Sequence, residues 1–132
     1  MAFLGLSALQ WLVLSILLTA VMWLPYVLNR AQVWGLNTSL GYPAEPKPLS
    51  AWAQRAKKAH ANAIENLVLF APLVIIHFLV SRGAPEIALW TALYFFGRLA
   101  HYLVYAAGIP YLRTATFAVG YTATLVIGVG LL

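Results

Sequence analysis

The chain has 132 residues, of which 63% are hydrophobic and only 8% are charged, and its formal net charge is +5. Because a soluble domain carries about 25% charged residues, this composition excludes a water-soluble globular protein and indicates an integral membrane protein with one domain, residues 1–132. The chain has no cysteine, which excludes disulfides, thiolate nucleophiles and cysteine-based metal sites, and no other metal site is expected. The positive charge is typical of membrane-protein loops rather than of nucleic-acid binding.

The first apolar stretch predicts a membrane-spanning helix over residues 4–29. It carries no charge over more than the about 20 residues that a spanning helix needs. A removable signal peptide is not favoured, because the stretch lacks a basic start and has no small-residue cleavage site after it. Pro25 is expected to kink or end the last turns of this helix. Residues 30–50 are rich in glycine and proline and predict a loop.

Three further helices are predicted over residues 51–80, 86–107 and 111–131, which gives an all-α bundle of four transmembrane helices. The second begins with a polar segment that is expected to extend beyond the hydrocarbon, because about 30 helical residues reach about 45 Å. A tight turn is expected at residues 81–85. Basic residues concentrate near the first and third connections, so the positive-inside rule places these connections in the cytoplasm and both termini on the other side.

The second helix carries its polar residues along one face. In the stretch "RAKKAHANAIENL", residues 55–67, Arg55, Lys58, Asn62 and Glu65 recur at steps of three and four. Residues at these spacings are neighbours on a helix surface. Taken alone, the basic residues of this stretch are typical of side chains that reach up to lipid headgroups.

The third helix repeats the pattern with Arg98, His101 and Tyr105, and Arg113 opens the fourth helix. Charged residues inside a spanning segment cost about 2.5–3.5 kcal/mol each near its centre, so they tend to face a bundle interior or a water-filled cavity. Because these residues and those of the second helix lie toward the same end of the bundle, we expect a polar pocket that is rich in cations and faces the cytoplasm.

Several cations with one nearby carboxylate suit a ligand that has more than one carboxylate, because arginine binds carboxylates through two parallel hydrogen bonds. An apolar wall open to the bilayer would admit a second, lipophilic reactant. An arginine beside a thiol would also stabilise the thiolate, and this thiol must belong to the ligand because the protein has no cysteine.

The two motifs resemble those of a known family. The stretch 55–67 resembles the second-helix motif of the MAPEG family, the membrane-associated proteins of eicosanoid and glutathione metabolism, which reads approximately Arg-x-x-Arg-Ala-x-x-Asn-x-x-Glu. The stretch "RLAHYLVYAAGIPYLR", residues 98–113, is similar to the family's Arg-x-x-(His/Tyr)-x-x-x-Tyr followed by a downstream arginine. Lys58 departs from the pattern, because a second arginine is usual there.

The resemblance implies a homotrimer with glutathione bound between subunits near the cytoplasmic face. Arg113 would be the catalytic residue that activates the glutathione thiol toward a lipophilic electrophile from the bilayer, in a transferase or peroxidase reaction. The residues expected to bind glutathione are Arg30, Arg55, Lys58, His60, Asn62, Glu65, Arg98, His101 and Tyr105.

Two alternatives to an enzyme remain open from the sequence. One is a non-catalytic membrane protein of the same fold that binds lipids or other hydrophobic ligands, since the family includes non-catalytic members. The other is a small transporter or channel subunit, but the fourth helix is almost free of polar groups beyond Thr124, which does not favour a polar path through the membrane. The short chain and small loops favour a bacterial inner membrane.

Overall fold

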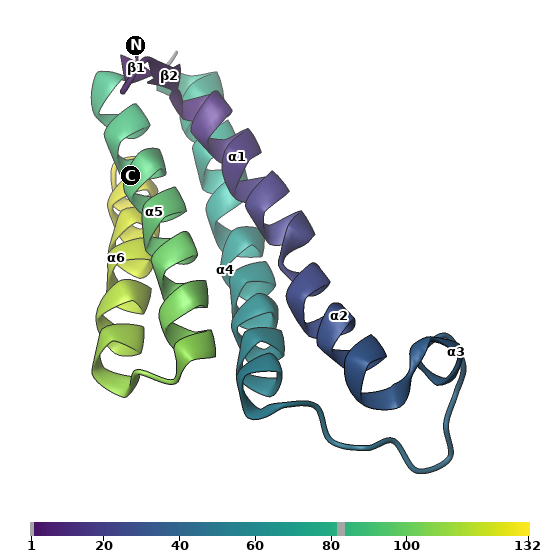
Figure 1. Cartoon of the computed structure of the whole chain (residues 1–132). Helices are drawn as coiled ribbons and strands as arrows, with labels where there is room; N and C mark the ends of the chain where they lie inside the picture. Colours follow the sequence, from purple (N-terminus) through teal and green to yellow (C-terminus); the bar gives the residue numbers. More distant parts are fainter. Residues whose placement is uncertain (1, 82–83) are drawn as a thin grey trace.

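The computed structural model describes residues 2–81 and 84–132, and its helices lie side by side as a bundle (Figure 1). In this part of the chain, four helical segments are long and apolar enough to cross a membrane, the first of them being α1 and α2 taken together. The expected all-α membrane fold is therefore confirmed. The turn expected at residues 81–85 includes residues 82–83, which lie outside the described residues. The elements are β1 (Ala2–Phe3), β2 (Leu6–Ser7), α1 (Ala8–Val21), α2 (Trp23–Trp34), α3 (Leu36–Ser39), α4 (Ala51–Ser81), α5 (Pro85–Ala107) and α6 (Pro110–Val129).

The first span differs from its predicted bounds at both ends. Residues 2–7 form a small antiparallel hairpin of β1 and β2, and α1 begins only after Ser7. The Ser7 hydroxyl accepts a hydrogen bond from the Gln10 backbone N–H, and the Gln10 side chain accepts one from the Ser7 backbone N–H. This reciprocal cap satisfies two of the N–H groups that a helix start leaves without partners, so it fixes where α1 begins.

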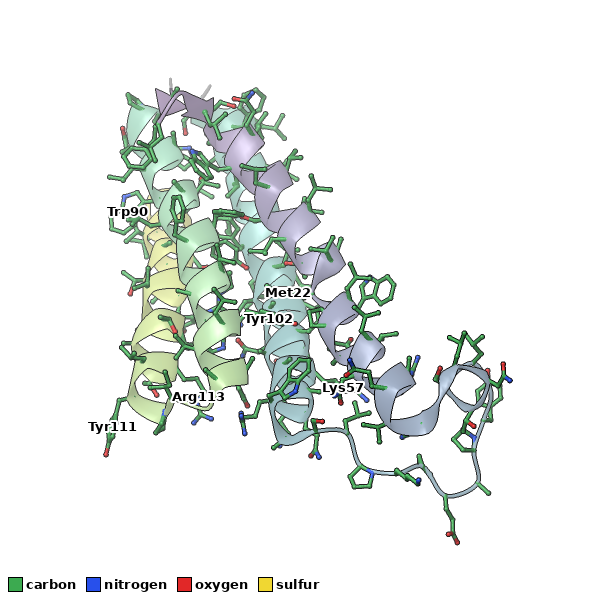
Figure 2. The ribbon with its side chains drawn as sticks, in the orientation of Figure 1. Met22, Lys57, Trp90, Tyr102, Tyr111 and Arg113 are labelled. Atoms are coloured by element: carbon green, nitrogen blue, oxygen red, sulfur yellow. The ribbon has the colours of Figure 1, made fainter. Side chains whose placement is uncertain are left out.

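Pro25 interrupts the first span without ending it. The break between α1 and α2 lies at Met22, where the backbone N–H bonds to the Thr19 carbonyl at 3.4 Å, and α2 then continues to Trp34. Proline has no N–H, and its ring crowds the carbonyl four residues earlier, so the helix is disturbed in the turn before Pro25. The Tyr102 hydroxyl of α5 donates a 2.8 Å hydrogen bond to the Met22 carbonyl at this break (Figure 2).

The central helix of the bundle is α5. It packs against α1, α4 and α6, and 50% of its most apolar stretch is buried, compared with 22–28% in the other three spans. The other spans turn leucine, valine and isoleucine side chains outward, as lipid-facing surfaces do. The core between α4 and α5 is built around Phe70 and Tyr94, whose rings stack with centroids 3.5 Å apart. Residues carried by α5 are therefore the ones held most firmly.

A pair of glycines brings α5 and α6 close together. A Cβ on Gly97 would lie 3.1 Å from the Gly120 backbone nitrogen and 3.2 Å from a Val119 methyl group. Small residues at helix contacts let two backbones approach closely in membranes, where packing rather than hydrophobic burial drives association. The α5–α6 contact therefore has no room for a side chain at Gly97.

Replacing Gly97 with valine is expected to lower the stability of the bundle. The added methyl groups would force α5 and α6 apart, and overpacking of this kind costs about 1–3 kcal/mol. The measurement is the unfolding temperature of the purified protein in detergent, followed by helical circular dichroism. The matched control is Ala118→Val, which adds a larger side chain on the exposed face of α6. Equal unfolding temperatures for the two variants would contradict the close contact.

Candidate functional site

The polar residues of three helices meet at one end of the bundle. There the first half of α4, the last turns of α5 and the start of α6 line a cavity of about 200 Å³ that is open on one side. This is the end at which α2 and the α5–α6 turn also lie, and Figure 2 shows Arg113 there. The cavity is lined by Asn62, His101, Tyr105, Arg113, Thr114 and Phe117.

Arg98 lies beside this cavity and is only 2% exposed. Its Nη1 donates a 2.9 Å hydrogen bond to the Asn62 side-chain oxygen, and its Nη2 donates a longer one, 3.4 Å, to the Phe117 carbonyl. The guanidinium also lies over the Phe117 ring, 5.3 Å from its centroid. Its Nε finds no hydrogen-bond partner among the described residues. The cation is thus held by neutral groups, and because a buried charge without a counter-charge is costly, the site favours an anion.

A glycine on α6 makes room for this arginine. A Cβ built on Gly120 would lie 2.9 Å from the Arg98 Nε, closer than real Cβ contacts allow. The guanidinium therefore lies directly across the backbone of α6. Gly97, one residue before Arg98, packs against Gly120 and Val119, so Gly120 both takes part in the close helix contact and leaves the space for the arginine.

His101 connects α5 to the first turn of α6. Its Nδ1 lies 3.1 Å from the Arg113 backbone carbonyl. A carbonyl can only accept, so Nδ1 carries the hydrogen, and in the neutral ring Nε2 is then an acceptor. That Nε2 is buried and has no partner within the described part of the chain. The His101 ring also meets the ring of Tyr105 edge to face at 5.5 Å, so the histidine orients both the tyrosine and the start of α6.

The α5–α6 turn folds Arg113 back over α5. Gly108 ends α5 in the left-handed conformation, with φ 80° and ψ 31°, which glycine adopts without strain. Pro110 then starts α6, where its missing N–H costs nothing. As a result, the exposed Arg113 guanidinium lies 4.9 Å from the centroid of the Tyr105 ring. Arg113 also sits in the first turn of α6, where the helix dipole is positive, so the two add to one electropositive edge of the cavity.

Two of the residues expected at the cavity make contacts elsewhere in the structure. Arg55 donates from Nε to the Ala106 carbonyl at 3.0 Å and packs against Gly108, so it fastens the end of α5 to α4. His60 pairs through Nδ1 with the Tyr26 hydroxyl at 2.9 Å, which links α4 to α2. Both contacts join helices within one chain.

Of the three other expected residues, Lys58 and Glu65 lie on the outside of the single chain, and Arg30 is half-buried with its Nε enclosed. Lys58 and Glu65 are exposed on α4, and Lys58 lines a separate open cavity of about 440 Å³ with Lys57. The Arg30 guanidinium on α2 lies 5.6 Å from the Trp34 ring. Among the residues that the sequence singled out, the structure therefore brings together Asn62, Arg98, His101, Tyr105 and Arg113.

The sequence pointed to Gly120 only as a glycine that could let helices approach closely, and it did not single out Thr114 or Phe117, although a signal was present. Phe117 and Gly120 come after Arg113 at steps of four and three, which places all three on one face of α6. Phe117 contributes a carbonyl and a ring to Arg98, and Gly120 contributes the space. Neither residue has a polar side chain, so in the sequence only their helical spacing from Arg113 connects them with the polar site.

Comparison with known proteins gives one match. A family model described as the MAPEG family matches residues 8–132, nearly the whole chain, and confirms the resemblance that the two motifs indicated. No curated protein and no solved structure matches the chain significantly.

The hydrogen bond between Asn62 and Arg98 is expected to couple the two residues energetically. In a double-mutant cycle of Asn62→Ala and Arg98→Met, the coupling free energy should be about 1.5–3 kcal/mol, as for other hydrogen bonds to charged groups. The measurement is the free energy of unfolding in mixed micelles, followed by tryptophan fluorescence. A second cycle pairing Asn62→Ala with Lys57→Met serves as the control and should be additive. Additivity in both cycles would contradict the assigned contact.

Proposed function

The chain belongs to the MAPEG family, and from this premise we propose that it is a glutathione-dependent membrane transferase or peroxidase that acts on lipophilic electrophiles. The observation that carries the proposal is the buried Arg98 guanidinium, which is held by neutral groups beside a cavity with Arg113 at its edge. Glutathione would supply the nucleophilic thiol, and the protein would bind it, orient it and hold its sulfur as the thiolate.

The groups around the cavity suit glutathione, which carries two carboxylates, amide groups and a thiol. Arg98 and the electropositive start of α6 would bind the carboxylates, because guanidinium groups and helix N-termini both favour anions. Asn62 and Tyr105 offer neutral hydrogen bonds at the same cavity. The buried Nε2 of His101 is an acceptor, so it suits an N–H or S–H donor that enters with the ligand.

The size of the cavity supports a site completed by a second subunit. Ligand pockets for molecules of this size have volumes of about 300–1,000 Å³, and the cavity in one chain is about 200 Å³. We propose a homotrimer in which a neighbouring chain closes the open side. Lys58 and Glu65 are exposed outside the cavity of their own chain, and we place them, with the half-buried Arg30 and His60, at the glutathione site of a neighbouring chain. Arg55 acts by positioning the α5–α6 turn.

Arg113 is the residue proposed to stabilise the thiolate. A guanidinium group is a cation, and a cation near a thiol favours ionisation of that thiol. We place the surface beside the cavity against the bilayer, which would give a lipophilic electrophile a route to the sulfur. The basic first and third connections support a cytoplasmic position for this end of the bundle, with both chain termini on the other side. The small loops favour a bacterial inner membrane.

A second candidate function is supported by an apolar groove between α4 and α6. The groove has a volume of about 420 Å³ and lies nearer the opposite end of the bundle from Arg113. It would suit a hydrophobic ligand in a non-catalytic protein of the same fold. Glutathione binding distinguishes the two candidates, because a protein that only holds lipids has no use for it. The residues lining the groove are Leu69, Leu73, Tyr121, Thr124, Leu125, Gly128, Val129 and Leu132.

Glutathione is expected to bind the detergent-purified protein, as measured by titration calorimetry. Arg98→Lys, which keeps the charge but loses the planar fork, should weaken binding about 30-fold or more. Lys57→Ala removes a cation outside the cavity and should leave affinity within about twofold. Native mass spectrometry of the same samples should give the mass of a trimer. Absence of binding at millimolar glutathione would contradict the enzyme and favour the lipid-binding candidate.

Removing the Arg113 guanidinium is expected to change the pH dependence of the reaction. The pKa of a free cysteine thiol is about 8.5, and the arginine should lower that of the bound thiol. In Arg113→Ala, kcat with a model electrophile should fall about 100-fold at neutral pH and recover as the pH rises through about 8–9, where the thiol ionises without help. Lys57→Ala should keep the pH profile of the natural protein. An unchanged profile in Arg113→Ala would show that another group ionises the thiol.

A further inference from the structure

The first connection begins at the surface of the membrane. The span Ala8–Trp34 has 27 residues and is therefore about 40 Å long, so it crosses the about 30 Å hydrocarbon core and reaches into the headgroup region at its ends. Arg30 and Trp34, whose side chains lie against each other, mark this level, since tryptophan and basic residues are enriched at the interface. The segment after Trp34 thus starts among the headgroups.

The chain does not continue from there straight into water. Gly35, with φ 80° and ψ 155°, turns it, and α3 lies to the side of the bundle, level with the last turns of α2 (Figure 1). Leu36 begins α3 and Leu40 directly follows its last residue, one helical turn later; they are 66% and 78% exposed, and Tyr42 is fully exposed. Transferring a leucine side chain out of water is worth about 1.5–3 kcal/mol, so the two leucines favour an apolar partner, and the Tyr42 ring extends the same apolar segment.

The segment is held at this level by hydrogen bonds at its base. The buried Asn29 side chain donates to the Ser50 hydroxyl at 2.9 Å and accepts from the Ser50 backbone N–H at 3.0 Å. Trp34 donates from its ring nitrogen to the Lys47 carbonyl at 2.7 Å. These bonds join the two ends of the connection, so residues 35–49 form a closed loop and α3 cannot swing freely away from the membrane surface.

We propose that α3 and the residues directly after it form an interfacial membrane anchor, in which Leu36, Leu40 and Tyr42 insert into the lipid at the boundary between headgroups and acyl chains. The partner is the leaflet that the first connection faces. Apolar segments that lie flat at this boundary are buried about 5–10 Å below the headgroups. The anchor would fix the tilt of α2, and with it Asn29 and Arg30, relative to the bilayer.

Lipid is the partner that the surroundings of α3 favour. The lipid-facing surface of α2 leads directly to it, because Leu24 and Leu28 are 41% and 62% exposed on the last turns before Trp34. Lys47, exposed near the base of the loop, is placed to reach up to phosphate groups. An apolar segment that is continuous with a lipid-facing helix and flanked by a basic side chain has the composition of an interfacial anchor.

The absence of cysteine from the chain makes a direct test simple. Single-cysteine variants Leu36→Cys and Leu40→Cys are spin-labelled in lipid nanodiscs, and Asn37→Cys, on another face of α3, and Glu45→Cys, later in the loop, are the matched controls. Collisions with oxygen, which concentrates in lipid, and with a water-soluble nickel complex are measured by electron paramagnetic resonance. We expect oxygen to dominate at positions 36 and 40 and the nickel complex to dominate at positions 37 and 45.

Two outcomes would overturn the anchor. Equal access of the nickel complex at all four positions would place α3 in water. Shielding of positions 36 and 40 from both reagents would place them against protein, as in contact with a second copy of the chain. Each variant's fold is checked by circular dichroism, and glutathione binding is measured separately, so that failure of the anchor and failure of the proposed enzyme are distinguished.

Discussion

The buried guanidinium of Arg98 is the constraint on which the rest of the site depends. A cation 2% exposed between membrane helices is costly unless it is hydrogen-bonded, and here Nη1 donates to the Asn62 side chain and Nη2 to the Phe117 carbonyl. These bonds tie α4, α5 and α6 together at one level. Gly120 has to lack a side chain for the arginine to lie there. The position of the Arg98 charge therefore depends both on its hydrogen-bond partner Asn62 and on the absence of a Cβ at Gly120.

The residues that line the cavity are held by well-packed elements of the bundle. The central helix α5 supplies Arg98, His101 and Tyr105 from positions fixed by packing on three sides. Arg113 reaches the cavity from the start of α6, held by the tight turn at Gly108 and by the His101 contact to its carbonyl. Residues that need precise placement thus come from rigid elements, which keeps the geometry of a binding site defined.

The exposed residues bear on the oligomeric state. The four spans show a large apolar surface to lipid, and the cavity of a single chain is open and small. Lys58 and Glu65 on α4 are exposed and do not line that cavity. Both features are what a subunit presents when its site is finished at an interface, and they support the proposed homotrimer over a monomer.

The sequence by itself determined the membrane class, the four spans and the two polar motifs, because hydropathy and helical periodicity are local properties that survive in any tertiary arrangement. It also indicated the family, which the match over residues 8–132 supports. It did not determine which way each helix is rotated. Arg55 and His60 share a helix with Asn62, yet only Asn62 meets Arg98, because contacts between helices depend on packing angles that no single segment encodes. The roles of Phe117 and Gly120 were decided only by the tertiary structure, since one acts through its backbone carbonyl and ring and the other through the space that its missing side chain leaves.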